Sequence, residues 1–204
     1  MTMTPPADLS ARVEAMFADG IGTLEAARRE LPEIAAAAAA ALAESLAHGG
    51  KILICGNGGS ASDSLHFSSE LLNKFERVRR PLAAVSLSAD ISALTSIAND
   101  ESYDAVFSKQ IEALGRDGDM LVAITTSGNS PNILQAVRAA HAANMRCVAL
   151  NGKGGGELSK LLGANDIDIV APGRSTARIQ EIHGILIHAF CDLIDRQLFG
   201  DAKS

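Results

Sequence analysis

A histidine and a glutamate lie one helical turn apart in the stretch from Lys51 to Glu70, which reads KILICGNGGSASDSLHFSSE. At positions i and i+4, His66 and Glu70 would share one face of a helix. An imidazole and a carboxylate so placed can bind a metal ion or move a proton. Such a pair is more often a surface ion pair, so its interpretation depends on what lies around it.

The same stretch begins with a glycine-rich turn. Residues 51–55 form a short, apolar run, which is typical of a buried parallel strand. The turn over Gly56, Asn57, Gly58 and Gly59 lets a ligand approach the main chain closely. Ser60 stands where a helix N-cap is expected, and a helix N-terminus attracts phosphate. The alternative is a turn of the kind that many α/β proteins have without any ligand.

A hydroxyl-rich segment, TTSGNS, follows a second apolar run at residues 120–125. It carries the hydroxyl groups of Thr125, Thr126, Ser127 and Ser130, and Pro131 suits the first position of the next helix. Hydroxyl and free N–H donors without a lysine favour a small phosphate monoester over the alternative of a plain helix cap. The sequence has neither GxxxxGK[ST] nor GxGxxG, so nucleotide triphosphate and dinucleotide loops are not indicated.

The last predicted helix carries polar residues on an otherwise apolar background, RIQEIHGILIH. Gln180 and His183 share one face, and Glu181 and His188 share another. Buried polar groups must be hydrogen-bonded or ligated, but spacing alone leaves open which of these act. Gln180 and His188 are two turns apart, about 12 Å along the axis, so they could join one metal only by leaning together.

Composition narrows the classes of partner. Of 204 residues, 47% are hydrophobic and 3% aromatic, and the net charge is −6. These values argue against nucleic-acid binding, which favours basic and aromatic surfaces. Cys55, Cys147 and Cys191 lie far apart in apolar contexts and suggest reduced, buried thiols. The first ten residues do not look like a signal peptide, and no run suits a membrane span, so we expect a cytoplasmic protein without membrane partners.

Hydrophobic patterning predicts one α/β domain over residues 1–204. We expect a loose tail over 1–7, two helices within 8–48 and an α/β core over 51–198. The strands are expected at 51–55, 81–88, 120–125, 146–150 and 167–171. The helices are expected at 9–31, 32–48, 91–98, 103–114, 131–144, 157–162 and 176–198, with a break at 99–100, besides the one after the glycine-rich turn. This alternation predicts a parallel sheet covered by helices on both faces, with ligands at the carboxyl ends of its strands.

Five motifs together resemble a known family. They are CGNGGSASDSLHFSSEL, IAND at Ile97–Asp100, TTSGNS, LNGKGGGEL and RIQEIHGILIH. In this order and spacing they are similar to the sugar isomerase (SIS) family and, within it, to the phosphoheptose isomerases. The resemblance implies the SIS fold, with a five-stranded parallel sheet, and a homotetramer that uses the two leading helices and has its active sites at subunit interfaces.

The resemblance also implies an activity and a set of site residues. The reaction would convert sedoheptulose 7-phosphate to D-glycero-D-manno-heptose 7-phosphate through an enediol, for a surface glycan such as lipopolysaccharide. Glu70 and His188 match the acid–base pair. The residues that match the ligands of one Zn²⁺ per subunit are His66, Glu70, Gln180 and His188. The residues that match substrate contacts are Asn57, Gly58, Gly59, Glu70, Asn99, Asp100, Thr125, Thr126, Ser127, Ser130 and Gln180.

Three positions depart from the family pattern. Asn73-Lys74 replaces a common Gly-Arg, Ala177 replaces an Asp of some members, and Glu101-Ser102-Tyr103 replaces an aromatic-glycine turn. The main alternative is a non-enzymatic SIS tetramer that binds the bacterial replication initiator. Another is a regulatory SIS module that senses a sugar phosphate. Neither would need His66, Glu70, Gln180 and His188 together, so the resemblance favours the isomerase.

Overall fold

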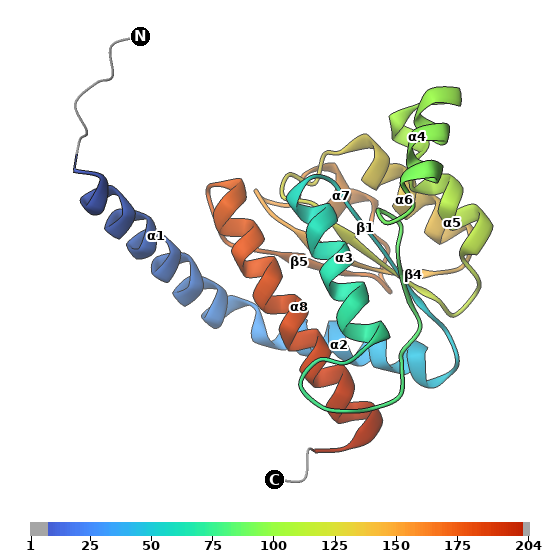
Figure 1. Ribbon diagram of the computed structural model, residues 1–204, viewed down its shortest axis with the longest axis horizontal. Coiled ribbons are helices and arrows are strands. Elements are labelled where there is room, and N and C mark those ends of the chain that lie inside the picture. Colours follow the sequence, from blue (N-terminus) through green and yellow to red (C-terminus); the bar gives the residue numbers. More distant parts are fainter. Residues whose placement is uncertain (1–7, 202–204) are drawn as a thin grey trace.

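A parallel sheet of five strands forms the centre of the protein, as the computed structural model shows (Figure 1). The structure describes residues 8–201, so the tail expected over 1–7 lies outside the described residues. The strand order is β2-β1-β3-β4-β5. The strands are β1 (Ile52–Gly56), β2 (Ala84–Ser86), β3 (Met120–Ile124), β4 (Arg146–Asn151) and β5 (Ile167–Val170). The family's expected five-stranded parallel sheet is therefore confirmed.

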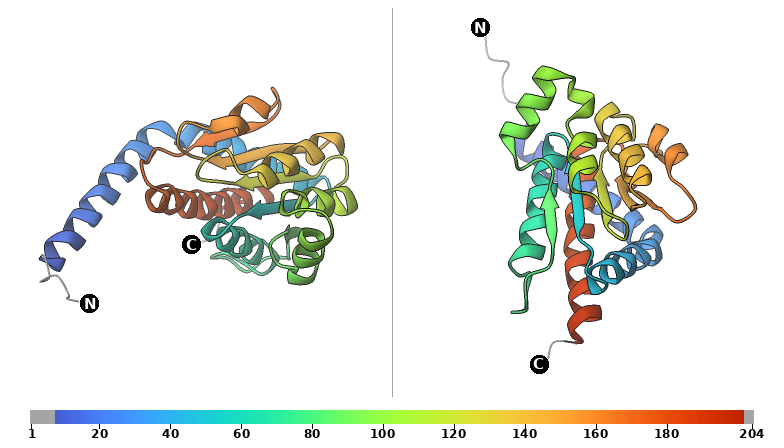
Figure 2. Two further views of the ribbon diagram at one scale, coloured as in Figure 1. Left: turned by 90° about the horizontal axis from the view of Figure 1, so that it is seen from above. Right: turned by 90° about the vertical axis from the view of Figure 1, so that its right-hand side faces the viewer.

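Helices cover both faces of this sheet (Figure 2). They are α1 (Leu9–Glu30), α2 (Pro32–Ala47), α3 (Gly59–Leu72), α4 (Ile91–Asp100), α5 (Ser108–Leu114), α6 (Pro131–Ala142), α7 (Gly156–Leu161) and α8 (Thr176–Phe199). Helices α2, α3 and α8 pack on one face, in a core with Ile54 and Val122. Helices α5, α6 and α7 pack on the other, in a core with Leu53 and Leu121. Successive side chains of a strand point to opposite faces, so neighbouring residues enter different cores.

The central strands are apolar throughout because both of their faces are covered. All five residues of β1 and of β3 are buried. Ile52 pairs with Ala84 on one side and with Met120 on the other, so β1 has parallel neighbours at both edges. This burial pattern is the one that continuous apolar runs predict for internal parallel strands. Because β1 and β3 are parallel neighbours, with Gly56 opposite Ile124, the turns that follow them lie side by side at the carboxyl edge of the sheet.

Helices α3 and α8 lie beside each other and both start near that edge (Figure 1). The side chains of Phe67 and Phe190 meet between them, with ring centroids 6.1 Å apart. Helix α8 begins at Thr176, and the hydroxyl of Ser175 caps it by accepting a hydrogen bond from the backbone N–H of Arg178. Phe67 on α3 and Phe190 on α8 therefore come close although they are more than a hundred positions apart in the sequence.

Several local expectations were wrong. Helix α3 begins at Gly59 with Gly58 as its N-cap, so Ser60 lies inside the helix and does not cap it. The break expected at Asn99 and Asp100 lies directly after them, because α4 continues through Asp100 and ends there. The helix expected at 103–114 is a 3₁₀ turn, Tyr103–Ala105, followed by α5. Propensity cannot separate a 3₁₀ turn from an α-helix, since both use the same residue types.

Helix α1 extends away from the sheet (Figures 1 and 2). Its Asp8 carboxylate accepts a hydrogen bond from the backbone N–H of Ala11, which caps the helix. Its apolar side chains are largely exposed, and Phe17 (71%) and Ile21 (61%) are examples. The guanidinium of Arg178 on α8 donates to the carbonyl of Met16 and holds α1 in place. Among the described residues, no helix is long and apolar enough to cross a membrane.

Candidate active site

A pocket of about 290 Å³ opens at the carboxyl ends of β1 and β3, where the two motif turns meet. It brings together eight residues predicted to contact substrate, namely Asn57, Gly58, Gly59, Thr125, Thr126, Ser127, Ser130 and Gln180. Ser60, Ile124 and Thr176 complete its lining. Within the described part of the chain, every residue lining this pocket is uncharged. It therefore offers hydroxyl, amide and backbone groups to a ligand.

The turn after β1 needs glycine for two reasons. Gly58 has φ of +56°, a left-handed conformation that side chains disfavour. A Cβ added at Gly59 would lie 2.4 Å from the side-chain nitrogen of Gln180. Gln180 therefore packs directly against the start of α3, which places its amide in the pocket. The two elements that the sequence could not bring together meet here because α8 begins beside α3.

The hydroxyl-rich loop after β3 rests on the loop after β4. Gly128 has φ of +66°, and a Cβ there would collide with the carbonyl oxygen of Gly155. The backbone N–H of Leu158 donates to the carbonyl of Gly128 at 2.9 Å. The backbone N–H of Glu157 donates to the side-chain oxygen of Asn129 at 3.0 Å. The loop that presents Thr125–Ser130 is therefore held against the loop after β4 by one main-chain hydrogen bond and one hydrogen bond to the Asn129 side chain.

A buried histidine supports the loop after β4. His183 is fully buried, and its Nε2 lies 2.9 Å from the carbonyl oxygen of Asn151. Burial lowers the pKa of His183 below its ordinary value, because the charged imidazolium is poorly solvated there. The neutral ring then donates from Nε2. Asn151 itself donates to the carbonyl of Gly155 at 2.8 Å, so two short contacts link His183 to Gly155, against which Gly128 of the hydroxyl-rich loop packs.

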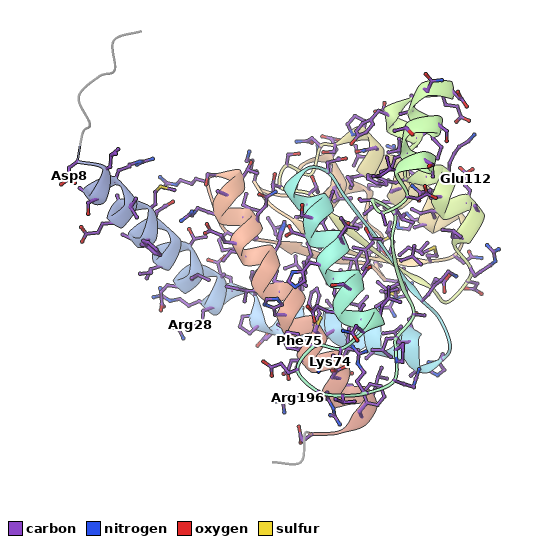
Figure 3. The ribbon with its side chains drawn as sticks, in the orientation of Figure 1. Asp8, Arg28, Lys74, Phe75, Glu112 and Arg196 are labelled. Atoms are coloured by element: carbon purple, nitrogen blue, oxygen red, sulfur yellow. The ribbon has the colours of Figure 1, made fainter. Side chains whose placement is uncertain are left out.

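Three of the four predicted metal ligands, which include the predicted acid–base pair, form a second cluster further along α3 and α8. The His66 Nε2 lies 3.2 Å from a Glu70 oxygen. The rings of His66 and His188 have centroids 5.1 Å apart and meet edge to face. The ring of Phe75, which is labelled in Figure 3, stacks on His188 with centroids 5.5 Å apart. The structure thus brings His66, Glu70 and His188 together.

The donor set of this cluster suits a divalent metal. Two ligand atoms of a tetrahedral zinc ion lie about 3.4 Å apart when each bond is about 2.0–2.1 Å. The 3.2 Å between the Nε2 of His66 and the Glu70 oxygen is also that of an ion pair, and within the described residues only His141, Cys147 and Asp166 have ligand atoms that all lie within 4.8 Å of one another. Gln180 lies instead beside Gly59, two turns before His188 on α8. Gly184 lies between them, and a Cβ there would meet no atom within 4 Å, so there is open space on this face.

Asn99 and Asp100 do not line the pocket. Both are exposed at the end of α4, where the Asn99 amide donates to the Asp100 carboxylate at 2.8 Å. The nearby Tyr103 hydroxyl donates to the side-chain oxygen of Asn57 at 2.9 Å. The amide of Asn132 donates to the same oxygen at 2.9 Å. The segment after α4 therefore reaches the pocket through Tyr103, while Asn99 and Asp100 face outward.

Several residues in and around the pocket were not predicted from the sequence. Thr176 is the first residue of α8, and its place after β5 at the carboxyl edge was the signal that could have indicated it. Tyr103 and Asn132 orient Asn57, but nothing in their sequence spacing connects them with it. Asp63 lies on α3 between the pocket and the His66 cluster. Burial raises the pKa of Asp63, and the nearby His66 partly offsets this effect.

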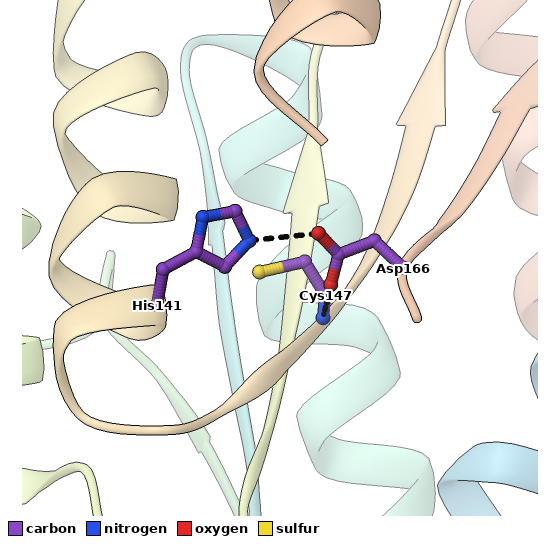
Figure 4. A group of neighbouring side chains, drawn as sticks. All are labelled: His141, Cys147 and Asp166. Carbon is purple, nitrogen blue, oxygen red and sulfur yellow. Dashed lines mark hydrogen bonds and ion pairs between the residues drawn. The ribbon is translucent and has the colours of Figure 1, made fainter. Parts of the chain in front are cut away.

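A separate group at the opposite edge of the sheet has the composition of a possible metal site. The ligand atoms of His141, Cys147 and Asp166 all lie within 4.8 Å of one another (Figure 4). The Nε2 of His141 lies 2.7 Å from Asp166, which also accepts hydrogen bonds from the backbone N–H groups of Cys147 and Gly163. Burial and the Asp166 charge raise the pKa of the Cys147 thiol. These contacts explain the group as a structural link between α6 and β5.

Comparisons with known proteins agree with this geometry. Residues 17–152 match the SIS domain family. A phosphoheptose isomerase of Chromohalobacter salexigens is 53% identical, over 96% of this chain and 100% of that protein. A phosphoheptose isomerase of Shewanella sediminis is also 53% identical, over 92% of this chain and 95% of that protein. These relatives favour the isomerase over the non-enzymatic tetramer.

Solved structures show the same likeness. The phosphoheptose isomerase of Neisseria gonorrhoeae is 49% identical with a TM-score of 0.88, over 92% of this chain and 98% of that one. The phosphoheptose isomerase of Francisella tularensis is 39% identical with a TM-score of 0.91, over 93% of this chain and all of that one. Motifs, fold and relatives agree, and the chain belongs to the SIS domain family as a phosphoheptose isomerase, an aldose–ketose isomerase.

Proposed function

We propose that this enzyme converts sedoheptulose 7-phosphate to D-glycero-D-manno-heptose 7-phosphate, for the synthesis of a heptose-containing surface glycan. One observation supports this above the others. An uncharged pocket rich in hydroxyl groups lies at the start of α3 and α8, and an imidazole–carboxylate cluster lies further along the same two helices. From Gly59 to His66 the helix rises about 10 Å, which is on the scale of an extended seven-carbon sugar phosphate.

The pocket would hold the phosphate group. The hydroxyl groups of Thr125, Thr126, Ser127 and Ser130 surround a space that adjoins the N-termini of α3 and α6. Free N–H groups at helix N-termini and the helix dipole stabilise an anion without a basic side chain. Asn57, Gly58, Gly59 and Gln180 would contact the sugar between the phosphate and the reacting carbons.

The cluster of His66, Glu70 and His188 would perform the proton transfers. Isomerisation moves a proton between C1 and C2 through an enediol, and a second proton moves between the two oxygen atoms. We assign the C–H proton to the Glu70 carboxylate and the oxygen proton to the His188 imidazole. The side chain of Glu70 is 22% exposed, so solvent reaches it only in part before substrate binds.

We propose His66, Glu70, Gln180 and His188 as the ligands of one zinc ion. His66, Glu70 and His188 already lie together, and the open space at Gly184 leaves room for the Gln180 side chain to lean towards them. A bound divalent ion would polarise the carbonyl group and stabilise the charge that develops on oxygen. His66 would serve only as a ligand, since Glu70 and His188 supply the acid and base.

A homotetramer in the cytoplasm, with active sites between subunits, is part of the same proposal. The side chain of His66 is 44% exposed, although proton transfer benefits from exclusion of water. The exposed apolar side chains of α1 line a space of about 400 Å³ against Arg178 and Glu181. A neighbouring subunit covering these surfaces would enclose the cluster. Asn99 and Asp100, exposed on α4, would then contact substrate in the pocket of a neighbour.

Turnover of sedoheptulose 7-phosphate by the purified protein tests this function. We expect zinc-dependent formation of the aldose, and its loss in Glu70→Gln and in His188→Ala. Both variants should keep the far-UV circular dichroism and the oligomeric state of the parent, since the replaced side chains are not core residues. A folded, zinc-loaded protein without turnover would contradict the assigned substrate. Full activity in both variants would contradict the assigned acid and base.

A further inference from the structure

A buried arginine joins the two helices that carry Glu70 and His188. Arg79 comes from the irregular segment between α3 and β2, and its side chain is only 2% exposed. Its Nε donates to Asp195 on α8 at 2.8 Å. Its two terminal nitrogens donate to backbone carbonyl groups, including those of Glu70 and Leu71, each at 2.8 Å. One guanidinium therefore contacts both helices at once.

The contacts on α3 are with the end of the helix. The last carbonyl groups of a helix have no partner within it, and the helix dipole makes that end negative. Arg79 donates to the carbonyls of Glu70, Leu71 and Asn73, so it satisfies these groups and places a positive charge beside them. One of them belongs to Glu70 itself, the proposed base. The main chain that carries the Glu70 carboxylate is thus held by a side chain.

The contact on α8 is two turns beyond His188. Asp195 follows His188 by seven residues, about 10 Å along the helix, and its side chain is 4% exposed. Its second oxygen is buried and has no hydrogen-bond partner in the described structure. Its charge is therefore balanced mainly by Arg79. A planar guanidinium suits this geometry, because its five N–H donors are fixed in direction, whereas a lysine offers one compact charge.

We propose that Arg79 and Asp195 are a positioning pair, which sets the Glu70 carboxylate at the working distance from the His188 imidazole. This inference rests on the proposed function of Glu70 and His188. In the described structure Arg79 does not line the pocket and has no hydrogen bond to the side chains of His66, Glu70 or His188, so it acts through the main chain of Glu70. A displacement of about 1 Å between reacting groups can lower a rate by about 100-fold.

A purely structural role is the alternative, and the two roles predict different results. A buried ion pair is weak evidence for stability, since well-packed apolar residues often replace it without loss. The double variant Arg79→Met with Asp195→Leu removes both charges and both sets of directed contacts. If the pair serves only stability, the melting temperature and kcat of this double variant should both return from the values of Arg79→Lys towards those of the parent. If the pair positions Glu70, the melting temperature should recover while kcat stays low.

The experiment measures kcat, KM and melting temperature for the parent, Arg79→Lys and the double variant. We expect kcat to fall about 10- to 100-fold in both, with KM changed less than about threefold. Arg77→Met is the matched control. Arg77 lies in the same segment and donates to the carbonyls of Phe199 and Gly200 at the end of α8, but it has no hydrogen bond to α3 in the described structure. The kcat of the Arg77→Met variant should equal that of the parent.

A second measurement does not depend on turnover. With Co²⁺ in place of zinc, the visible absorption spectrum reports ligand geometry, and we expect it to change in Arg79→Lys but not in Arg77→Met. Parental kcat in Arg79→Lys, or joint recovery of kcat and melting temperature in the double variant, would overturn the proposal. If the parent itself fails to turn over sedoheptulose 7-phosphate, the proposed function fails. The Co²⁺ spectra then decide the positioning role alone, and unchanged spectra would overturn it.

Discussion

The imidazole rings of His66 and His188 lie with their centroids 5.1 Å apart and their planes at 82°. They belong to α3 and α8, and 122 positions separate them in the sequence. Glu70 contacts the first ring and Phe75 stacks on the second, so a carboxylate and two imidazoles share one surface. This relationship places the proposed acid–base pair and three of the proposed zinc ligands at one surface.

Removal of the acid or the base should affect turnover far more than stability. General acid–base catalysis contributes about 10²- to 10⁴-fold, so we expect kcat to fall by that order in Glu70→Gln and in His188→Asn. Steady-state turnover of the sugar phosphate measures the effect. Glu112→Gln, which changes an exposed carboxylate on α5, is the matched control and should retain parental kcat. A loss below threefold in either site variant would refute the assignment.

Metal content should distinguish His66 from Gln180. His66 already lies against Glu70 and near His188, whereas Gln180 packs on Gly59. We therefore expect His66→Ala to lose more bound zinc than Gln180→Ala does after identical dialysis. Inductively coupled plasma mass spectrometry of the dialysed proteins measures the zinc content. Equal losses would contradict this ranking and would mean that Gln180 is as strong a ligand as His66.

The turn at Gly128 should tolerate no side chain. An added Cβ would meet the Gly155 carbonyl at an impossible distance, and the φ of +66° is unfavourable for alanine. We expect Gly128→Ala to lose about 1–3 kcal/mol of stability and to raise KM for the sugar phosphate, because the loop must move. Urea denaturation and steady-state kinetics measure the two effects.

Gly22→Ala provides the matched control for that substitution. Gly22 lies within α1, and an added Cβ would meet no atom within 4 Å. Alanine favours a helix over glycine by about 0.5–1 kcal/mol, so this variant should be slightly more stable and kinetically unchanged. Equal behaviour of the two variants would show that the Gly128 conformation is not required.

His183 should make stability depend on pH. Burial lowers its pKa in the folded protein below the ordinary value of 6.5. As pH falls through 6.5, the unfolded chain binds a proton that the folded chain does not, so the free energy of unfolding decreases. The loss continues until pH reaches the folded pKa. Melting temperatures measured between pH 8 and pH 5 should show this fall.

Two substitutions separate the contribution of His183 from that of other groups. His183→Gln keeps a donor near the position of Nε2 and removes the titration, so it should flatten the fall in melting temperature. It should also raise KM less than His183→Ala does, because the Asn151 carbonyl keeps a partner. His48→Gln, at an exposed histidine, should leave the pH profile unchanged. If the melting temperature of His183→Gln depends on pH as that of the parent does, this explanation is wrong.

The sequence alone determined the parallel sheet, most element positions and the chemical types of the site. Continuous apolar runs at 51–55 and 120–125 predicted internal strands, because both faces of such strands are buried, and the structure has strands at 52–56 and 120–124. The glycine turn and the TTSGNS loop were placed correctly at the carboxyl ends of those strands. Local patterning carries this information, since it depends on periods of two and 3.6 residues.

Only the tertiary structure decided which distant residues meet. The sequence could not place Gln180 against Gly59 or His188 beside His66, because the packing of α3 on α8 sets these contacts. It could not connect Tyr103 with Asn57, or show that Asn99 and Asp100 are exposed and do not line the pocket. It gave no sign that Arg79 spans two helices. Such contacts depend on how helices and the sheet pack around a shared core. The local periodicity of the sequence does not encode which distant residues this packing brings together.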